Sequence, residues 1–167
     1  MNRHLIPDHH ASSLYEVPLL ALWDRGIRCL VLDLDNTLVP WNTRIFDDKL
    51  AGWLQQARDI GFTLFLLSNG GSKRVRETAE DLDLKCIASA GKPRPGAFLA
   101  AASQAGFKPA DCAAIGDQLF TDILGANRAG FYSVLVDPIS RDEFCLTRIS
   151  RMMERMIHRP LNCGTRK

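Results

Sequence analysis

Short apolar runs alternate with helix-like segments along most of this chain. Apolar residues recur at helical spacing near 47–60, 72–82, 95–105 and 121–129, and strand-like runs occur near 29–34, 63–67, 86–88, 113–115 and 133–136. This order of strand and helix patterns is typical of βα units. It predicts an α/β fold of three layers, in which helices cover both faces of a mainly parallel, five-stranded sheet.

The same pattern predicts one domain over residues 1–167, with a core at about 25–140 and flanking helices at about 13–24 and 141–158. Residues typical of helix ends support the boundaries: Pro95 at a start and, as stops, Gly61, Gly106 and Gly130. The chain has 167 residues, of which 46% are hydrophobic and 24% charged, so it suits a single hydrophobic core.

Two carboxylates stand where the first apolar run ends in a polar turn. Asp33 and Asp35 are two residues apart, and residues with this spacing share one face of a strand. Such a pair suits phosphoryl transfer, because one carboxylate can attack phosphorus while the other gives and then takes a proton. A capped turn between strand and helix explains the same residues, since the D-x-D-x-T pattern also occurs by chance.

Three further polar clusters follow later apolar runs. Residues 68–71, Ser-Asn-Gly-Gly, suit an anion as well as an ordinary helix cap. Lys92 stands between turn residues, either as a positive charge for a phosphoryl group or as a solvated surface lysine. Asp117 suits Mg²⁺ at the end of a strand, while Asp122 would orient Asp117 or a metal-bound water, or complement a helix dipole.

The order of these clusters points to one shared site. Four successive runs each deliver polar residues at their carboxyl ends, and open α/β sheets bind ligands at that edge. Chance rarely produces this arrangement four times. In this order the clusters match the four motifs of the haloacid-dehalogenase (HAD) superfamily of phosphohydrolases, which the chain resembles over about residues 5–158: Asp33-x-Asp35-x-Thr37, Ser68, Lys92, and Gly116-Asp117 with Asp122.

Two longer stretches are similar to one branch of that superfamily. They are residues 32–41, LDLDNTLVPW, and residues 116–128, GDQLFTDILGANR. The branch is the YqeG-type group of subfamily IIIA, which includes phosphatidylglycerophosphate phosphatases of bacteria, plastids and mitochondria. The resemblance implies a Rossmann-like fold and an Mg²⁺-dependent phosphatase that forms an aspartyl-phosphate and acts on phosphatidylglycerophosphate.

The resemblance also implies a role for each motif residue. Asp33 would be the nucleophile and Asp35 the general acid and base. The Asp33 carboxylate, the Asp35 backbone carbonyl and Asp117 would hold Mg²⁺, with Asp122 supporting them. Lys92 would neutralise charge shared by the phosphoryl group and its nucleophile. Three residues would bind the phosphoryl oxygens: Thr37, Ser68 and Asn69.

The spacing of the motifs leaves no room for a cap domain. Asp33 and Ser68 are 35 residues apart and Ser68 and Lys92 are 24 apart, each just enough for one helix and its loops. A site without a cap stays open to a large phosphorylated substrate, such as a lipid headgroup. The alternatives are a phosphatase for phosphoproteins, nucleotides or other soluble phosphoesters, and a catalytically idle binding module. The last is disfavoured because every acidic and basic motif residue is present.

Composition bears on partners and compartment. A net charge of +2 gives no reason to expect nucleic acid. Five cysteines without a C-x-x-C pair indicate neither a zinc site nor a disulfide framework, and favour a reducing cytoplasm. The longest early apolar run, residues 17–23, is far shorter than the roughly 20 residues that span a bilayer, and no signal peptide precedes it. The four histidines lie near the chain ends and are expected at the surface: His4, His9, His10 and His158.

The expected helix at 141–158 carries a basic stripe beside an apolar one. The arginines are Arg148, Arg151, Arg155 and Arg159, and the apolar residues are Ile149, Met152, Met153 and Met156. This helix would either contact anionic lipid at the inner face of the membrane or pack on the sheet. Trp41, Asn42 and Arg44 would likewise contact a headgroup or form a packed loop. The sequence leaves the oligomeric state open.

Overall fold

The computed structural model describes residues 3–140, and its strands form one six-stranded sheet in the order β1-β6-β5-β2-β3-β4. Every neighbouring pair is parallel. The strands are β1 (His9–Ala11), β2 (Cys29–Leu32), β3 (Thr63–Leu67), β4 (Lys85–Ile87), β5 (Cys112–Gly116) and β6 (Tyr132–Val136). The predicted parallel α/β sheet is confirmed, but the expected number of five strands is wrong.

The strand missed by the sequence pattern is β1, at one edge of the sheet. It has three residues, of which only Ala11 is buried, so it shows no hydrophobic alternation. Its place is set by backbone pairing with β6, where His9 lies opposite Val134. The exposed His10 side chain contacts Asp137 at 2.8 Å, as expected for a surface histidine.

In the described part of the chain, five α-helices connect or flank the strands, and most lie where the pattern predicts them. They are α1 (Leu19–Asp24), α2 (Asp48–Ile60), α3 (Ser72–Asp81), α4 (Pro95–Ala105) and α5 (Leu124–Ala129). Short 3₁₀ turns occupy η1 (Arg3–Leu5), η2 (Leu14–Glu16) and η3 (Pro109–Asp111), and a π-helical turn forms η4 (Leu119–Ile123). The predicted glycine stops are confirmed, since Gly61, Gly106 and Gly130 end helices with φ of 114°, 83° and 78°.

The predicted N-terminal helix at 13–24 is wrong in its first half. A 3₁₀ turn, η2, occupies Leu14–Glu16, and α1 begins only at Leu19. Pro18 stands between them and has no N–H with which to continue a helical hydrogen-bond ladder. The predicted helix at 121–129 is also divided, because its beginning belongs to the π-helical turn η4.

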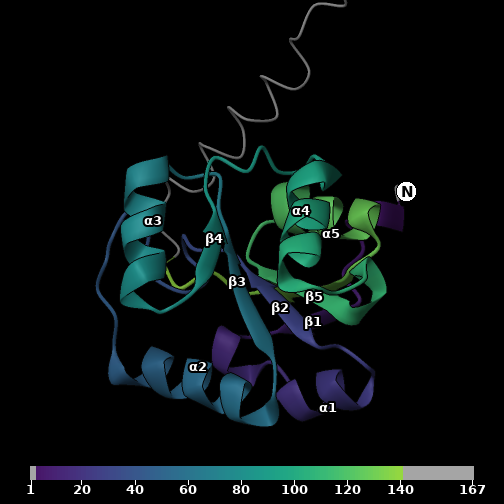
Figure 1. Ribbon diagram of the computed structural model, residues 1–167, viewed down its shortest axis with the longest axis horizontal. Helices are drawn as coiled ribbons and strands as arrows, with labels where there is room; N and C mark the ends of the chain where they lie inside the picture. Colours follow the sequence, from purple (N-terminus) through teal and green to yellow (C-terminus); the bar gives the residue numbers. More distant parts are fainter. Residues whose placement is uncertain (1–2, 141–167) are drawn as a thin grey trace, which may run out of the picture.

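The sheet separates two hydrophobic clusters, one on each face. Along β2, Leu30 and Leu32 belong to the cluster that includes Leu54 of α2, while the alternating Val31 belongs to the cluster that includes Phe98 of α4. Figure 1 shows α3 and α4 on opposite sides of the strands. The three-layer arrangement therefore follows from the alternation of side chains along buried strands.

The order in which the chain adds strands reverses between β2 and β5, the two central strands of the sheet. From β2 the chain runs outward through β3 and β4, then returns to β5 on the other side of β2. Ligands bind at the carboxyl ends of strands at such a switch point. The Asp33 N–H donates to Ile115 O at 2.9 Å, which brings the ends of β2 and β5 together.

Between residues 3 and 140 no cap domain interrupts the βα units, and no helix there is long and apolar enough to cross a membrane. The predicted helix at 141–158 and its membrane contact lie outside the described residues. That contact stays a prediction.

Candidate active site

Lys92 lies at the centre of a buried ion-pair cluster. Its ammonium group donates to Asp33 Oδ1 and Asp122 Oδ1, each at 2.5 Å, and to Leu67 O at 3.0 Å. Its side chain is only 3% exposed. Burial alone would lower the pKa of Lys92, but the carboxylates of Asp122 and Asp33 outweigh it and raise the pKa above its usual value. Lys92 is therefore a fixed positive charge, and its role toward a phosphoryl group stays a prediction.

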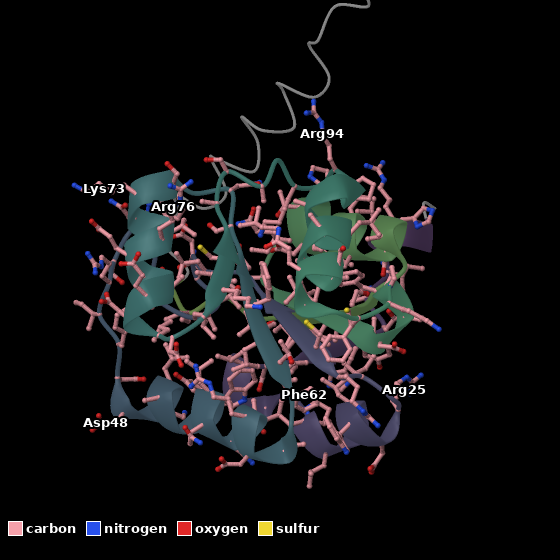
Figure 2. The ribbon with its side chains drawn as sticks, viewed as in Figure 1. Arg25, Asp48, Phe62, Lys73, Arg76 and Arg94 are labelled. Atoms are coloured by element: carbon pink, nitrogen blue, oxygen red, sulfur yellow. The ribbon has the colours of Figure 1, made fainter. Side chains whose placement is uncertain are left out.

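The Asn69 side chain, in the neighbouring loop, forms two hydrogen bonds with the backbone of Lys92. Its Oδ1 accepts the Lys92 N–H at 2.8 Å, and its Nδ2 donates to the Lys92 carbonyl at 3.2 Å. Figure 2 places Arg94, just after this loop, at the opposite end of the sheet from Phe62, which precedes β3. The loop thus lies at the carboxyl edge. Asn69 was expected to bind phosphate; its amide instead contacts Lys92, and phosphate contact stays a prediction.

Three carboxylates surround this lysine. Asp33, Asp117 and Asp122 each present an oxygen, and these oxygens lie within 4.8 Å of one another. The Thr37 hydroxyl lies between two of them, 3.5 Å from Asp33 Oδ2 and 3.5 Å from Asp117 Oδ1. One lysine cannot balance three carboxylates, so the cluster has an excess of negative charge. Closely spaced hard oxygen donors with this charge fit a divalent cation such as Mg²⁺.

The pKa values of two of these carboxyl groups reflect that crowding. Burial raises the pKa of Asp33 to about 7, with Asp122 adding to the rise and Lys92 opposing it. Burial, followed by repulsion from Asp33 and Asp122, raises the pKa of Asp117 to about 8. A bound cation would lower the pKa of both groups, because it stabilises their ionised forms. An ordinary buried acid has no such cation beside it.

This crowding makes the metal-free protein's stability depend on pH. Because both folded-state pKa values lie above the ordinary value of 3.8, the folded state binds more protons than the unfolded state between about pH 4 and about pH 8. The free energy of unfolding should therefore fall by a few kcal/mol as pH rises through this range. Urea unfolding with a chelator at about pH 5 and about pH 8 measures the change. Mg²⁺ should reduce it, and greater stability at the higher pH would contradict the argument.

Asp122 is held too tightly to be a simple metal ligand. Lys92 contacts its Oδ1, and the Gln118 N–H donates to its Oδ2 at 3.2 Å. It comes from the π-helical turn η4 and packs against Gly116. The oxygens better placed for a cation are therefore those of Asp33 and Asp117, and Asp122 positions Lys92. The expectation that Asp122 supports the metal ligands stays a prediction.

Gly116 is required by the close approach of Asp122. A Cβ atom at this position would lie 2.4 Å from Asp122 Cγ. Gly116→Ala should therefore displace Asp122 from Lys92, lower the free energy of unfolding by about 1–3 kcal/mol and reduce turnover. The control is Gly52→Ala in α2, where no atom lies within 4 Å of the added Cβ and the helix should be slightly more stable. Thermal unfolding of both variants tests this, and equal stability of both would oppose it.

Asp35 lies beside this cluster but its side chain faces a different group. Its Oδ1 accepts the Asn42 N–H at 3.1 Å, and its Oδ2 accepts from Arg74 at 2.5 Å. It is not among the three clustered carboxylates. The expectation that only its backbone carbonyl would touch a metal ion stays a prediction. The Asp35 side chain therefore differs from that of Asp33 in its hydrogen-bond partners and in lying outside the carboxylate cluster.

Arg74 was missed by the sequence analysis. It lies in the first turn of α3, and no acidic residue occurs in that turn. The sequence does carry a signal, because cations are disfavoured near a helix N-terminus unless something nearby requires them. Its partner Asp35 is 39 residues away, so the pairing itself could not be read from the pattern.

The remaining predicted residues lie at the rim or on the floor of the site. The buried Ser68 hydroxyl accepts the Gly70 N–H at 3.0 Å and still carries a hydrogen that it can donate. Arg44 contacts Glu77 and Asp81 of α3, which favours the packed-loop interpretation over headgroup contact. The Trp41 side chain is 40% exposed. The expectation that Trp41 touches a headgroup stays a prediction.

The fold and the site together define an α/β enzyme whose charged groups gather at the carboxyl edge of a parallel sheet. The chain is 33% identical over 157 residues to the probable phosphatase YqeG of Bacillus subtilis, covering 94% of this chain and 91% of the relative. A family model described as HAD-hydrolase-like matches residues 89–138. The chain belongs to the HAD-like hydrolases and is a phosphatase of that superfamily.

Two more distant similarities agree with this family. Phosphatidylglycerophosphate phosphatase 1, chloroplastic/mitochondrial, of Arabidopsis thaliana is 23% identical over 172 residues, which cover 96% of this chain and 49% of that protein. The structure of 3-deoxy-D-manno-octulosonate 8-phosphate phosphatase from Moraxella catarrhalis, in complex with magnesium, phosphate and KDO, matches with a TM-score of 0.51 at 20% identity. It covers 68% of this chain and 71% of that chain, and shows the likeness of fold.

Proposed function

We propose that this protein is an Mg²⁺-dependent phosphomonoesterase that forms an aspartyl-phosphate on Asp33 and acts on phosphatidylglycerophosphate. The observation that carries the proposal is the contact of buried Lys92 with Asp33 within a cluster of three carboxylates, of which Asp33 and Asp122 are buried and Asp117 is partly buried. An ordinary buried lysine needs one carboxylate to balance its charge, whereas three carboxylates that are all ionised need a further cation. A nucleophile, a fixed positive charge and a cation site are the parts that phosphoryl transfer requires.

In the first half of the reaction an Asp33 oxygen bonds to phosphorus while the bond from phosphorus to the ester oxygen breaks. Lys92 Nζ contacts Asp33 Oδ1 at 2.5 Å, so Oδ2 is the better placed attacking oxygen. The lysine stays charged throughout and offsets negative charge on the transferring group. Mg²⁺, held by Asp33, Asp117 and the Asp35 carbonyl, would supply further charge stabilisation when bound.

Asp35 moves the protons. It gives a proton to the departing ester oxygen, and in the second half it takes one from the water that attacks the aspartyl-phosphate. Inorganic phosphate then leaves and the Asp33 carboxylate is restored. The Ser68 hydroxyl and the Thr37 hydroxyl are the donors proposed for the phosphoryl oxygens. Both residues are buried, each 1% exposed, so their side chains are held by the surrounding protein.

The lipid substrate is supported by two observations of different kind. Within residues 3–140 no cap domain covers the site, and an uncovered site admits a phosphate displayed on a large assembly. The Arabidopsis relative is named for phosphatidylglycerophosphate. Other soluble phosphoesters, phosphoproteins and nucleotides are the competing substrates, and an idle binding module is the competing function.

A substrate panel with one variant tests the proposal. We expect phosphate release with Mg²⁺, and kcat/KM at least ~10-fold higher on phosphatidylglycerophosphate in mixed micelles than on soluble phosphoesters. Asp35→Asn should reduce turnover by ~10²–10⁴-fold while metal affinity changes little, because only the backbone of this residue is expected at the ion. Higher activity on a soluble ester would refute the lipid substrate, and a wild-type rate for Asp35→Asn would refute its proton-transfer role.

A further inference from the structure

We infer that Arg74 is a receptor for a second anionic group on the leaving-group side of the substrate, and this inference rests on the proposed function. The enzyme would then prefer phosphomonoesters whose alcohol portion carries another phosphate or phosphodiester. Arg74 donates to Asp35 Oδ2 at 2.5 Å and reaches the Thr43 carbonyl at 3.5 Å. Its side chain is 21% exposed, so it is in contact with solvent as well as with the protein.

The position of Asp35 determines where the alcohol portion must lie. As the proton donor, Asp35 has to reach the oxygen that joins phosphorus to the alcohol. Atoms beyond that oxygen must therefore pass near Asp35, and Arg74 contacts this same carboxylate. An anion a few atoms beyond the ester oxygen would come within reach of the Arg74 guanidinium.

The contact seen here also competes with the proton-transfer role of Asp35. The Asn42 N–H occupies Oδ1 at 3.1 Å and Arg74 occupies Oδ2, so both oxygens already accept hydrogen bonds. A carboxylate oxygen that accepts a hydrogen bond from the arginine is poorly placed to donate a proton to the ester oxygen. A substrate anion that draws the guanidinium away would release Asp35 Oδ2. Binding of the correct substrate would thereby prepare the site for proton transfer.

The surroundings of Arg74 support an anion rather than a neutral group. The acidic residues Glu77 and Asp81 on the same helix are paired with Arg44. A planar guanidinium binds phosphate oxygens in pairs, which a lysine cannot do. Figure 2 shows that the neighbouring Lys73 extends outward from α3, away from the sheet.

Gly70 lies close to both Arg74 and Ser68. A Cβ at Gly70 would lie 3.1 Å from the Arg74 guanidinium nitrogen and 3.1 Å from Ser68 Oγ. The guanidinium and the hydroxyl proposed to bind the transferring phosphate therefore both lie next to Gly70. Phosphatidylglycerophosphate has the required chemistry, since a glycerol unit separates its phosphomonoester from a phosphodiester.

Two soluble compounds separate this inference from lipid binding. Glycerol bisphosphate carries a phosphate on each terminal carbon, and glycerol phosphate carries only one. We expect wild-type kcat/KM to be ~10–100-fold higher for the bisphosphate, after correction for its two equivalent esters. Arg74→Ala should bring this ratio close to one mainly by lowering activity on the bisphosphate. Arg74→Lys should keep part of the preference, because it retains the charge without the planar fork.

The matched control is Arg76→Ala, an exposed arginine on the same helix, which should leave the ratio unchanged. Calorimetric binding of both compounds to Asp33→Asn, with and without Arg74→Ala, measures the preference without turnover. Loss of the binding preference in the double variant would support Arg74 as the anion receptor, whether or not the substrates are hydrolysed. Absence of hydrolysis by the wild-type enzyme would refute the proposed function and leave the receptor inference standing. An unchanged preference in Arg74→Ala, or an equal loss on both compounds, would overturn the inference.

Discussion

Replacing Asp33 with asparagine is expected to lower phosphate release by ~10⁴-fold or more while the protein stays folded. Asparagine has nearly the same shape, but its amide cannot attack phosphorus or carry the phosphoryl group. The change also removes one of three crowded carboxylates, and Lys92 keeps Asp122 and the Leu67 carbonyl as partners. Activity and stability should therefore move independently.

The stability of Asp33→Asn distinguishes a lost nucleophile from a damaged fold. Because burial raises the pKa of Asp33 to about 7, its ionised form is unfavourable in the metal-free protein above that pH. The variant should then be at least as stable as the wild type at about pH 8 in a chelator. Asp24→Asn, at an exposed position on α1, should change neither activity nor stability. Retention of more than about a hundredth of the wild-type rate would exclude Asp33 as nucleophile.

Lys92→Met should be the most destabilising single change in the site. The methionine side chain fills similar space but leaves Asp33 and Asp122 buried without the cation that each contacts at 2.5 Å. Removing one partner of a buried ion pair costs about 3–5 kcal/mol of unfolding free energy, and loss of the positive charge should slow turnover by ~10²–10³-fold. Urea unfolding in a chelator and steady-state kinetics with Mg²⁺ measure the two effects.

A double variant separates the electrostatic cause from a packing defect. Adding Asp122→Asn to Lys92→Met removes one unpaired carboxylate, so it should restore part of the lost stability without restoring activity. Mg²⁺ should also stabilise Lys92→Met, since a bound cation offsets the same charge. Lys73→Met provides the control, because that lysine is exposed on α3. If the double variant is less stable than Lys92→Met, unbalanced charge is not the cause of the loss.

The course of the chain through the sheet was largely predictable because burial leaves a pattern in the sequence. Strand β3 has the predicted bounds, Thr63–Leu67, since both faces of this interior strand are covered and the four buried positions after Thr63 are all apolar. Helix α4 begins at the predicted Pro95 and ends before Gly106, whose φ of 83° suits a residue without a side chain. Edge strand β1 was not predictable, because its pairing depends on backbone groups that every sequence provides.

The candidate site was predictable only in part, for a related reason. The motif residues Asp33, Lys92 and Asp117 follow apolar runs, so their common edge follows from the parallel order of the strands. The contacts among side chains depend on distances between segments far apart in the chain. Lys92 meets Asp122 across 30 residues, and Arg74 meets Asp35 across 39. The sequence around a lysine or arginine does not show which acidic side chain it will contact in the folded protein.

Local hydrophobic order in the chain was thus enough to predict a parallel α/β core and to place its charged residues at one edge, because burial and helix capping act within a few neighbouring residues. The partners of those charges emerged only when the strands and helices were packed together. Asp122 reaches Lys92 because Gly116 leaves space for it. Arg74 reaches Asp35 because helix α3 brings it beside the end of β2. Such contacts depend on shape and charge summed over distant segments, which is information that no single segment contains.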